Sequence, residues 1–309
     1  MSSEFQVWEV KTPYLNLHCG LGEGPYYEPA TQTVRFVDIK NKKLHTVSIN
    51  DPADLVTLSF DEPVTVTADI AGVDPKDKIL IGAKQGLAVL DRKTGEYEYI
   101  SKMEGEGLDR IRSNDGAVDP QGRFWMGSMT DFGKGDFRPE GSLLRFTQTS
   151  PPQLALTSLT IPNSVGWSPD QRTMYFTHSN AREVLAWDYD PSPSPSPSSV
   201  VTLSNKRIFY QHVGSGEPDG FRVDVEGNIW HAVYGESRVL KLSPEGKLIG
   251  EVRLPTRNIT CVEFVGEELF ITTAGDDGAA EGEESKVNGG ALFRVDVGVR
   301  GVGHDLFRL

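Results

Sequence analysis

The stretch RIRSNDGAVDPQGRFWMGSM, residues 110–129, combines a polar start, a tight turn and an apolar strand. Its DPQG segment supplies the Asp, Pro and Gly that tight turns favour, so the residues on either side are expected to pair as an antiparallel hairpin. The segment FWMGSM, residues 124–129, is rich in the aromatic and apolar residues of a buried strand. This order of features is therefore the unit to look for in the rest of the chain.

Six apolar strands of this kind recur, and their starts lie 40 to 55 residues apart. Several strands per repeat of roughly 40 to 50 residues is the spacing of propeller blades. Long helical stripes of apolar residues are missing from the sequence, which counts against α/β folds. We therefore predict an all-β, six-bladed β-propeller with four-stranded antiparallel blades around a central channel. The six strands are VRFVDI (34–39), ILIGAK (79–84), FWMGSM (124–129), MYFTHS (174–179), IWHAVY (229–234) and LFITTA (269–274).

The whole chain, residues 1–309, is expected to form a single propeller domain. The segment DPSPSPSPSS, residues 190–199, alternates Ser and Pro, cannot form a ladder, and is expected to be an exposed excursion within one blade. The acidic run DDGAAEGEES, residues 276–285, is expected to be a solvated loop. FQVWEV, residues 5–10, is expected to close the ring by adding a strand to the last blade, because an unpaired sheet edge would otherwise remain.

Composition excludes several classes of protein. The net charge of -13 disfavours binding to nucleic acid or to anionic membranes, both of which attract clustered Lys and Arg. The N-terminus lacks the features of a signal peptide, and no run of about 18 apolar residues is present to span a bilayer. We expect a cytoplasmic protein whose two cysteines, Cys19 and Cys261, remain thiols.

Most of the predicted inner strands begin with an oxygen-bearing side chain at a fixed distance before the turn. In the second hairpin the same count gives Asp69, although VTVTADI with a longer turn is an alternative inner strand, and in the sixth it gives Ile259 or Thr260. Counting back five positions from the first polar residue of the turn gives Glu23, Asn114, Asn163 and Asp219 in the other four hairpins.

These four residues form an all-oxygen set of two carboxylates and two carboxamides. Asn and Asp also favour turns, so turn formation alone is one explanation for their positions. A shared site is the other explanation, because hard cations such as Ca²⁺, Mg²⁺ and Mn²⁺ prefer oxygen ligands, whereas zinc is more often held by nitrogen or sulfur. With three protein ligands such a cation would keep open positions for water or substrate.

Four ordered motifs, LGEGPYYEPATQTVRFVDI, RSNDGAVDPQGRFWMGSM, IPNSVGWSPDQRTMYFTHS and EPDGFRVDVEGNIWHAVYGESRVLKLSPEG, together resemble the regucalcin, gluconolactonase and luciferin-regenerating-enzyme family of six-bladed propellers. The resemblance implies one divalent cation, with Ca²⁺, Zn²⁺, Mn²⁺ and Mg²⁺ all open. It implies that Arg112 and Asn114, with the adjoining Asp115, bind the substrate. The metal ligands that it implies are Glu23, Asn163 and Asp219.

The resemblance also implies an activity, the hydrolysis of a sugar (aldono) lactone to the aldonic acid. The metal would polarise the lactone carbonyl, and Asp219 is the expected general base toward the attacking water. Where related proteins carry a Glu that reaches substrate, this chain has Phe137, with Glu140 three residues further on. The identity of the sugar is therefore left open.

Two alternatives remain from the sequence: a non-catalytic calcium-binding regulatory protein, and a metal-dependent hydrolase of other esters or phosphotriesters. The expected partner is a small-molecule sugar lactone, with no nucleic acid and no membrane. The protein itself is expected to be a monomer or a weak homo-oligomer.

Overall fold

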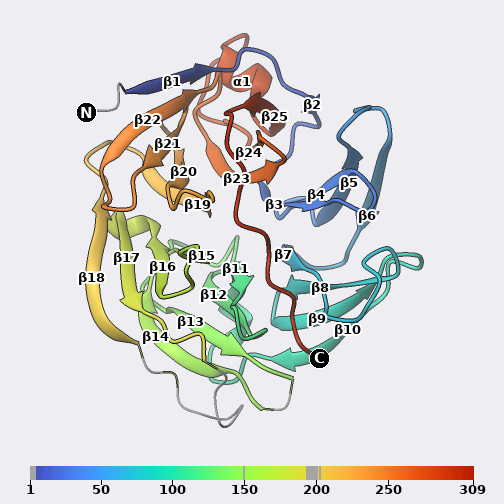
Figure 1. Ribbon diagram of the computed structural model, residues 1–309. Helices are drawn as coiled ribbons and strands as arrows, with labels where there is room; N and C mark the ends of the chain where they lie inside the picture. The colour runs from blue at the N-terminus through green and yellow to red at the C-terminus, as the bar shows by residue number, and fades with distance from the viewer. Residues whose placement is uncertain (1–4, 149, 193–200, 202) are drawn as a thin grey trace. The chain divides into compact units, whose positions relative to one another are not determined.

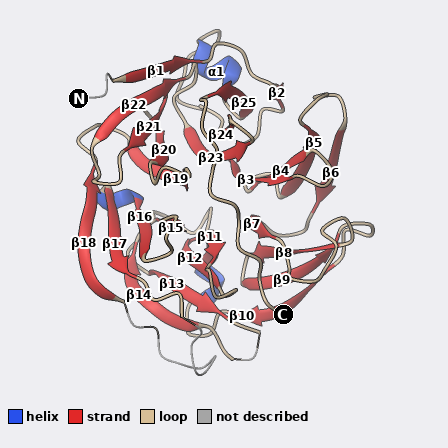
Figure 2. Cartoon of the chain, in the orientation of Figure 1, coloured by secondary structure: helices blue, strands red, loops and turns tan. Residues whose placement is uncertain are grey.

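The computed structural model of the protein describes residues 5–148, 150–192, 201 and 203–309. Its strands form six sheets, each containing a four-stranded antiparallel meander, and the fold is the predicted six-bladed β-propeller (Figure 1). Helix occurs as short pieces among the strands, as Figure 2 shows. In this described part of the chain, no helix has the length and hydropathy that crossing a bilayer would require. Most of the excursion predicted at residues 190–199 falls outside the described residues.

The chain divides into two compact units, and the first contains Met1–Leu58 with Phe209–Val302. In this unit the inner strand β23 packs between the inner strands β3 and β19. The three sheets, each given from its inner strand outward, are β3 (Gly22–Glu28), β4 (Thr33–Asp38), β5 (Lys43–Ser48) and β6 (Leu55–Ser59); β19 (Glu217–Val223), β20 (Ile229–Tyr234), β21 (Arg238–Leu242), β22 (Leu248–Arg253) and β1 (Gln6–Glu9); and β23 (Ile259–Val265), β24 (Glu268–Thr273), β25 (Ala291–Asp296) and β2 (Leu15–Asn16).

The prediction that residues 5–10 complete the last blade is wrong. Strand β1 pairs in parallel with β22 and is the fifth strand of the β19 sheet. The last blade takes its fourth strand from β2, in which Leu15 pairs with Leu292 of β25. The N-terminal segment therefore contributes to two sheets: β1 belongs to the blade before the last one, and β2 belongs to the last blade.

The acidic run at 276–285 is only partly the solvated loop that was predicted. Asp277 and residues 280–284 are exposed, but Asp276 is buried and accepts hydrogen bonds from Arg257 Nε at 2.7 Å and from Ser285 Oγ. The run leads into the short helix α1 (Glu284–Asn288). Asp276 is thus a structural anchor of this loop.

The second unit contains Ser59–Ile208 with Gly303–Leu309. In this unit β11 contacts both β7 and β15. Two 3₁₀ helices, η1 (Leu108–Arg110) and η2 (Ser179–Ala181), lie beside the strands. The three sheets are β7 (Val64–Ala68), β8 (Lys78–Ala83), β9 (Gly86–Asp91) and β10 (Tyr97–Lys102); β11 (Ile111–Val118), β12 (Phe124–Thr130), β13 (Gly141–Phe146) and β14 (Gln153–Leu159); and β15 (Pro162–Trp167), β16 (Thr173–His178), β17 (Glu183–Asp188) and β18 (Ser204–Gln211).

The turn chemistry that repeats in the sequence has a structural cause. The buried carboxylate of Asp119 accepts hydrogen bonds from the backbone of its own DPQG turn and from Trp125 Nε1 at 2.8 Å. Asp224 does the same in the turn before β20, with Trp230 Nε1 at 2.9 Å. Each Asp therefore fastens its turn to a tryptophan six residues later, which keeps the spacing of the two motifs equal.

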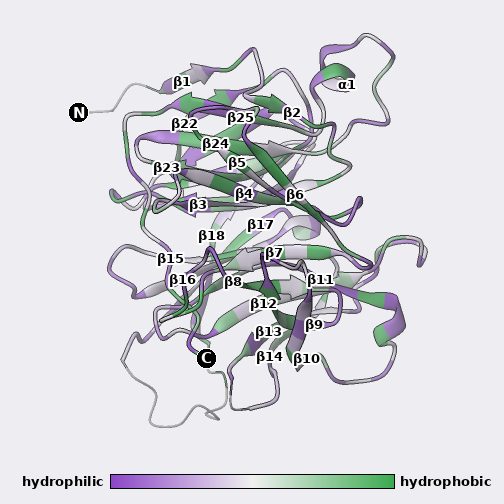
Figure 3. Cartoon of the chain, turned by 90° about the vertical axis from the view of Figure 1, so that its right-hand side faces the viewer, coloured by the Kyte–Doolittle hydropathy of each residue, from purple (hydrophilic) through white to green (hydrophobic). Residues whose placement is uncertain are grey.

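Apolar residues lie mainly along the strands, and much of the hydrophilic sequence lies in turns (Figure 3). Trp125 and Trp230 each belong to a buried hydrophobic cluster. The C-terminal residues join the core of the second unit, because Phe307 is buried beside Ile70 and its backbone N–H donates to Asp69 O at 3.0 Å. The sheets are thus packed largely through apolar side chains.

Candidate functional site

Every one of the six inner strands, all within the described residues, carries a β-bulge near its start. At these points the pairing with the next strand slips by one residue. A bulge turns a side chain out of the regular ladder, which is why bulges are common beside active sites. The residues at or directly beside the bulges are Glu23 with Gly24, Thr65, Asn114 with Asp115, Asn163 with Ser164, Asp219 with Gly220, and Thr260.

The structure places Asn114, Asn163 and Asp219 at the first position within their bulges, whereas Glu23 pairs with Val37 and directly precedes its bulge. For the second blade the alternative inner strand is confirmed: VTVTA forms β7, Thr65 is at its bulge, and Asp69, which the count gave, follows the end of the strand. The count failed because the turn after β7 is longer than in the other blades. In the sixth blade Thr260, and not Ile259, is the bulge residue.

In the first unit Glu23 and Asp219 lie on the two strands that flank β23. Their side chains are buried, with 6% and 8% of their surface exposed. Glu23 Oε2 accepts a hydrogen bond from Gly24 N at 2.8 Å, and the positive φ of Gly24, 53°, allows this close turn. Thr260 Oγ1 donates to Gly22 O at 2.6 Å and so joins β23 to the start of β3.

The backbone next to Asp219, on β19, packs closely against strand β23. A Cβ on Gly220 would overlap the side chain of Cys261 on β23, so only glycine allows β19 to approach at this bulge. Tyr234, on the neighbouring strand β20, has its pKa raised to about 12, mainly by burial and then by the carboxylates of Asp219 and Asp276. Tyr234 is therefore a neutral phenol beside Asp219 at any ordinary pH.

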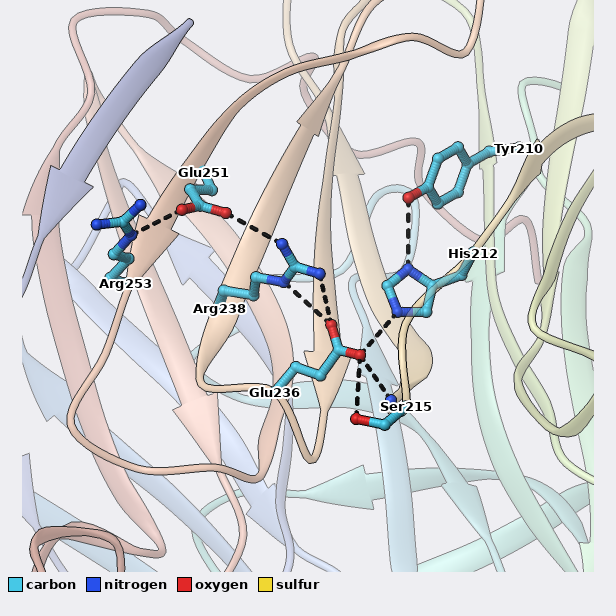
Figure 4. A network of polar contacts seen from close by, with 8 residues as sticks. Tyr210, His212, Ser215, Glu236, Arg238, Glu251 and Arg253 are labelled. Carbon is cyan, nitrogen blue, oxygen red and sulfur yellow. Dashed lines mark hydrogen bonds and ion pairs between the residues drawn. The ribbon is translucent and has the colours of Figure 1, made fainter.

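A network around Glu236 holds the segment that precedes Asp219 (Figure 4). Glu236 Oε1 accepts hydrogen bonds from Gly216 N at 2.7 Å and from His212 Nε2 at 3.2 Å, and its Oε2 accepts from Arg238 Nη2 at 2.7 Å. Burial opposes ionisation of Glu236, but the Gly216, Arg238 and His212 donors outweigh burial and lower its pKa to about 2. The Gly216 contact lies three residues before Asp219, so the network sets the path of the chain into β19.

The outer part of this network borders a cavity of about 500 Å³. Glu251 accepts hydrogen bonds from Arg238 Nη1 at 3.1 Å and from Arg253 Nε at 2.7 Å, which extends the row of alternating charges to the cavity wall (Figure 4). The cavity admits water to one side of the network, and this contact with solvent weakens its ion pairs.

In the second unit the polar residues of β11 and β15 are joined by direct hydrogen bonds. Asn114 Nδ2 donates to Pro162 O at 2.8 Å, and Ser164 Oγ donates to Asp115 Oδ2 at 2.5 Å. Asn163 Nδ2 donates to Ser179 Oγ at 3.3 Å, at the start of η2. The Asn114, Asp115 and Asn163 side chains are all buried, so their orientations are set by these bonds.

Arg112 lies beneath the loop that follows β12. Its Nη1 donates to Asn114 Oδ1 at 2.8 Å and to Ser113 O at 2.7 Å, and its guanidinium carbon lies 4.4 Å from the centre of the Phe132 ring. Phe137, further along the same loop, is 44% exposed and Glu140 is paired with Arg110 at 3.1 Å. Among the residues of this loop it is therefore Phe132 that covers the guanidinium.

Three buried side chains of the first unit lie close enough to share a metal ion, since ligand atoms of Cys19, Asp38 and His45 are within 4.8 Å of one another. The Asp38 carboxylate, however, already accepts hydrogen bonds from Gly20 N, Leu21 N and Asn41. Burial and the Asp38 charge raise the pKa of the Cys19 thiol, so it remains protonated. Both cysteines are free thiols, as predicted.

Thr65 and Glu236 were not found from the sequence as residues of the site, whereas Thr260 was one of the two residues that the count gave for the sixth blade. The bulge threonines follow the apolar residue at the start of a strand, VTVTA or ITCVEFV, and this alternation is the signal that could have identified them. Glu236 and Phe132 lie in loops and meet their partners through the tertiary fold, so no local pattern marks them.

The fold and the bulge residues define the class of this protein as a six-bladed β-propeller with polar side chains at the starts of its inner strands. Residues 21–275 match the family described as SMP-30/Gluconolactonase/LRE-like region, and the chain belongs to this family.

Relatives of this family cover nearly the whole chain. The protein is 33% identical over 301 residues to the pentonolactonase of Haloferax volcanii, covering 94% of this chain and 95% of that protein. It is 31% identical over 302 residues to regucalcin of Bos taurus, covering 93% and 94%. The crystal structure of a calcium-binding protein, regucalcin, from Agrobacterium tumefaciens matches with a TM-score of 0.84 at 25% identity, over 98% of this chain and 99% of that one. The family resemblance read from the sequence motifs is thus confirmed.

Proposed function

We propose that the protein is a metal-dependent lactonase that opens a sugar (aldono) lactone to the aldonic acid. The broader class, a sugar lactonase, is shown by the family and by the named lactonases among the relatives. The observation that carries the proposal is the presence of Glu23, Asn114, Asn163 and Asp219 within or directly before the bulges of four different inner strands.

We propose that Glu23, Asn163 and Asp219 hold one divalent cation, either Ca²⁺, Zn²⁺, Mn²⁺ or Mg²⁺. All three side chains offer oxygen and are buried, which suits a hard cation. A buried carboxylate needs compensation of its charge, and one cation would serve both Glu23 and Asp219. When bound, the cation supplies Lewis-acid polarisation of the lactone carbonyl and stabilises the negative charge that develops on its oxygen.

Residues of the chain itself would transfer the proton and bind the sugar. Asp219 would accept a proton from water as the water oxygen bonds to the carbonyl carbon; the ring C–O bond then breaks and the proton passes to the departing hydroxyl oxygen. Asn114 uses one hydrogen and one lone pair of its amide within the protein, and an amide has a second of each for a sugar hydroxyl. Asp115 and Arg112 would complete the substrate-binding group, Arg112 through its hydrogen bond to Asn114.

A calcium-binding regulatory role is the second candidate, because one solved relative is described as a calcium-binding protein. The two functions differ in turnover: a regulatory protein would bind Ca²⁺ and hydrolyse nothing.

The test is a proton-release assay on a panel of aldono-1,4- and aldono-1,5-lactones, with metal-free protein and after addition of each cation. We expect no turnover without metal and restored turnover with at least one cation. Asp219→Asn is expected to lower kcat by about 100-fold or more, whereas Glu217→Gln, two residues earlier on β19, serves as the matched control and keeps the activity. Activity in metal-free protein refutes the role of the cation; Ca²⁺ binding without turnover on any lactone would favour the regulatory function.

Three further features stay predictions. We propose that both units act as one domain spanning residues 1–309, that the protein is cytoplasmic, and that it is a monomer or a weak homo-oligomer. Gel filtration and light scattering of the purified chain address the last of these.

A further inference from the structure

The guanidinium of Arg112 is enclosed by groups of its own blade. The residue is 2% exposed. Its Nη1 is occupied by Ser113 O and Asn114 Oδ1, its Nη2 contacts Met129 Sδ at 3.2 Å, and the Phe132 ring lies over its face. These contacts engage both terminal nitrogens and one face of the guanidinium.

One contact of Arg112 orients the side chain of Asn114. Because Arg112 donates to Oδ1, the amide can only be oriented with Nδ2 toward Pro162 O, the acceptor on β15. The backbone of Asn114 is held as well, since Thr65 Oγ1 donates to its carbonyl oxygen at 2.8 Å. Arg112 thus fixes the orientation of the Asn114 amide, with Oδ1 toward the guanidinium and Nδ2 toward β15.

Contacts of the preceding residue, Asp131, hold Phe132 in place. Asp131, the preceding residue, pairs with Lys84 Nζ at 2.6 Å, and its backbone N–H donates to Arg110 O at 2.7 Å. Asp131 Oδ1 also accepts a hydrogen bond from Phe132 N at 2.8 Å. The ring is half-buried, so it presents a rigid apolar surface beside the polar bulge of β11.

We propose that Arg112 is a positioning residue that acts through Asn114, and that Phe132 is the specificity-determining residue of this blade, selecting uncharged aldonolactones. This inference rests on the proposed lactonase function. The aromatic face offers the C–H face of a lactone ring an apolar contact and, at the same time, screens the Arg112 charge from anionic substituents.

The first experiment compares Phe132→Ala with Phe137→Ala, a control in the same loop whose exposed ring is not stacked on Arg112. For neutral aldonolactones we expect the Phe132 variant to raise KM about 3- to 10-fold with little change in kcat. Its relative kcat/KM for a phosphorylated aldonolactone should rise, because the guanidinium is uncovered. Equal behaviour of the two variants, or no change in the ratio of neutral to anionic substrates, would overturn the specificity role.

The second experiment is a double-mutant cycle of Arg112→Lys and Asn114→Ala. If Arg112 acts through Asn114, the lysine substitution lowers kcat/KM in the native background and has no further effect when Asn114 is already alanine. Independent, multiplying effects would show that Arg112 contacts the substrate directly.

A readout without turnover separates this inference from the proposed function. Binding of a neutral alditol and of an alditol phosphate is measured by calorimetry, with circular dichroism to show that each variant is folded. If the protein hydrolyses no lactone, the lactonase proposal fails. The selectivity proposal fails if Phe132→Ala leaves the ratio of the two alditol affinities unchanged.

Discussion

Replacing Glu236 with Gln is expected to lower the free energy of unfolding by about 2 kcal/mol at pH 7. The pKa of Glu236 falls from 4.5 to about 2 in the folded protein, and at about 1.4 kcal/mol per pKa unit its ionised form is favoured by about 3 kcal/mol. The side chain is 10% exposed and borders a cavity, so contact with water reduces this value. Glutamine keeps an acceptor for Gly216 N but places an N–H₂ group or a neutral oxygen against Arg238.

The effect has a defined dependence on pH. Because the folded pKa is below the unfolded value, the stabilisation is complete above about pH 4.5 and is lost as the pH falls toward 2. The difference between wild type and Glu236→Gln should therefore be constant from pH 7 to 5 and shrink between pH 4.5 and 2.

Urea denaturation followed by tryptophan fluorescence at several pH values measures this difference. Glu267→Gln is the matched control, because Glu267 is 57% exposed and its 3.5 Å pair with Arg300 is expected to contribute no more than about 0.5 kcal/mol. An equal loss in both variants, or a difference for Glu236→Gln that stays constant down to pH 3, would refute the reasoning.

Other substitutions probe the remaining buried contacts. Glu28→Gln breaks a fully buried ion pair with Arg35 at 2.7 Å and should cost about 3 kcal/mol in urea denaturation; a loss below about 1 kcal/mol would contradict the pairing. Gly220→Ala forces a Cβ against Cys261 and should destabilise the protein by about 2 kcal/mol, so an unchanged denaturation midpoint would show that β19 can move. Burial raises the pKa of the Cys19 thiol, so iodoacetamide at pH 8 should label it slowly in native protein and rapidly in urea, as mass spectrometry can show.

The six-bladed fold was predictable because a repeated contact keeps the motifs in phase. Asp119 and Asp224 each bond to a tryptophan six residues on, so the turn and the strand cannot drift apart in sequence. The same regularity allowed the residues at four bulges to be found by counting. Counting did not find Thr65, because the turn after β7 is longer than the corresponding turns of the other blades.

The parts that could not be predicted depend on tertiary pairing. The stretch at residues 5–10 is apolar enough to be a strand, but its pairing partner, β22, is set by how the N-terminal segment crosses two sheets. The true closing strand, β2, has only two residues and leaves no pattern. Glu236 and Phe132 are ordinary loop residues in the sequence, and their roles come from Gly216 and Arg112, which the fold brings to them.

The six bulges have a consequence for how such a protein can evolve. Asn114, Asn163 and Asp219 lie within bulges and outside the regular strand register, so exchanging them disturbs no directly opposed cross-strand pair of side chains. The scaffold and the reactive groups are therefore encoded by different positions of the same strands. A lineage could exchange the chemistry of such a propeller one strand at a time and retain a foldable protein at every step.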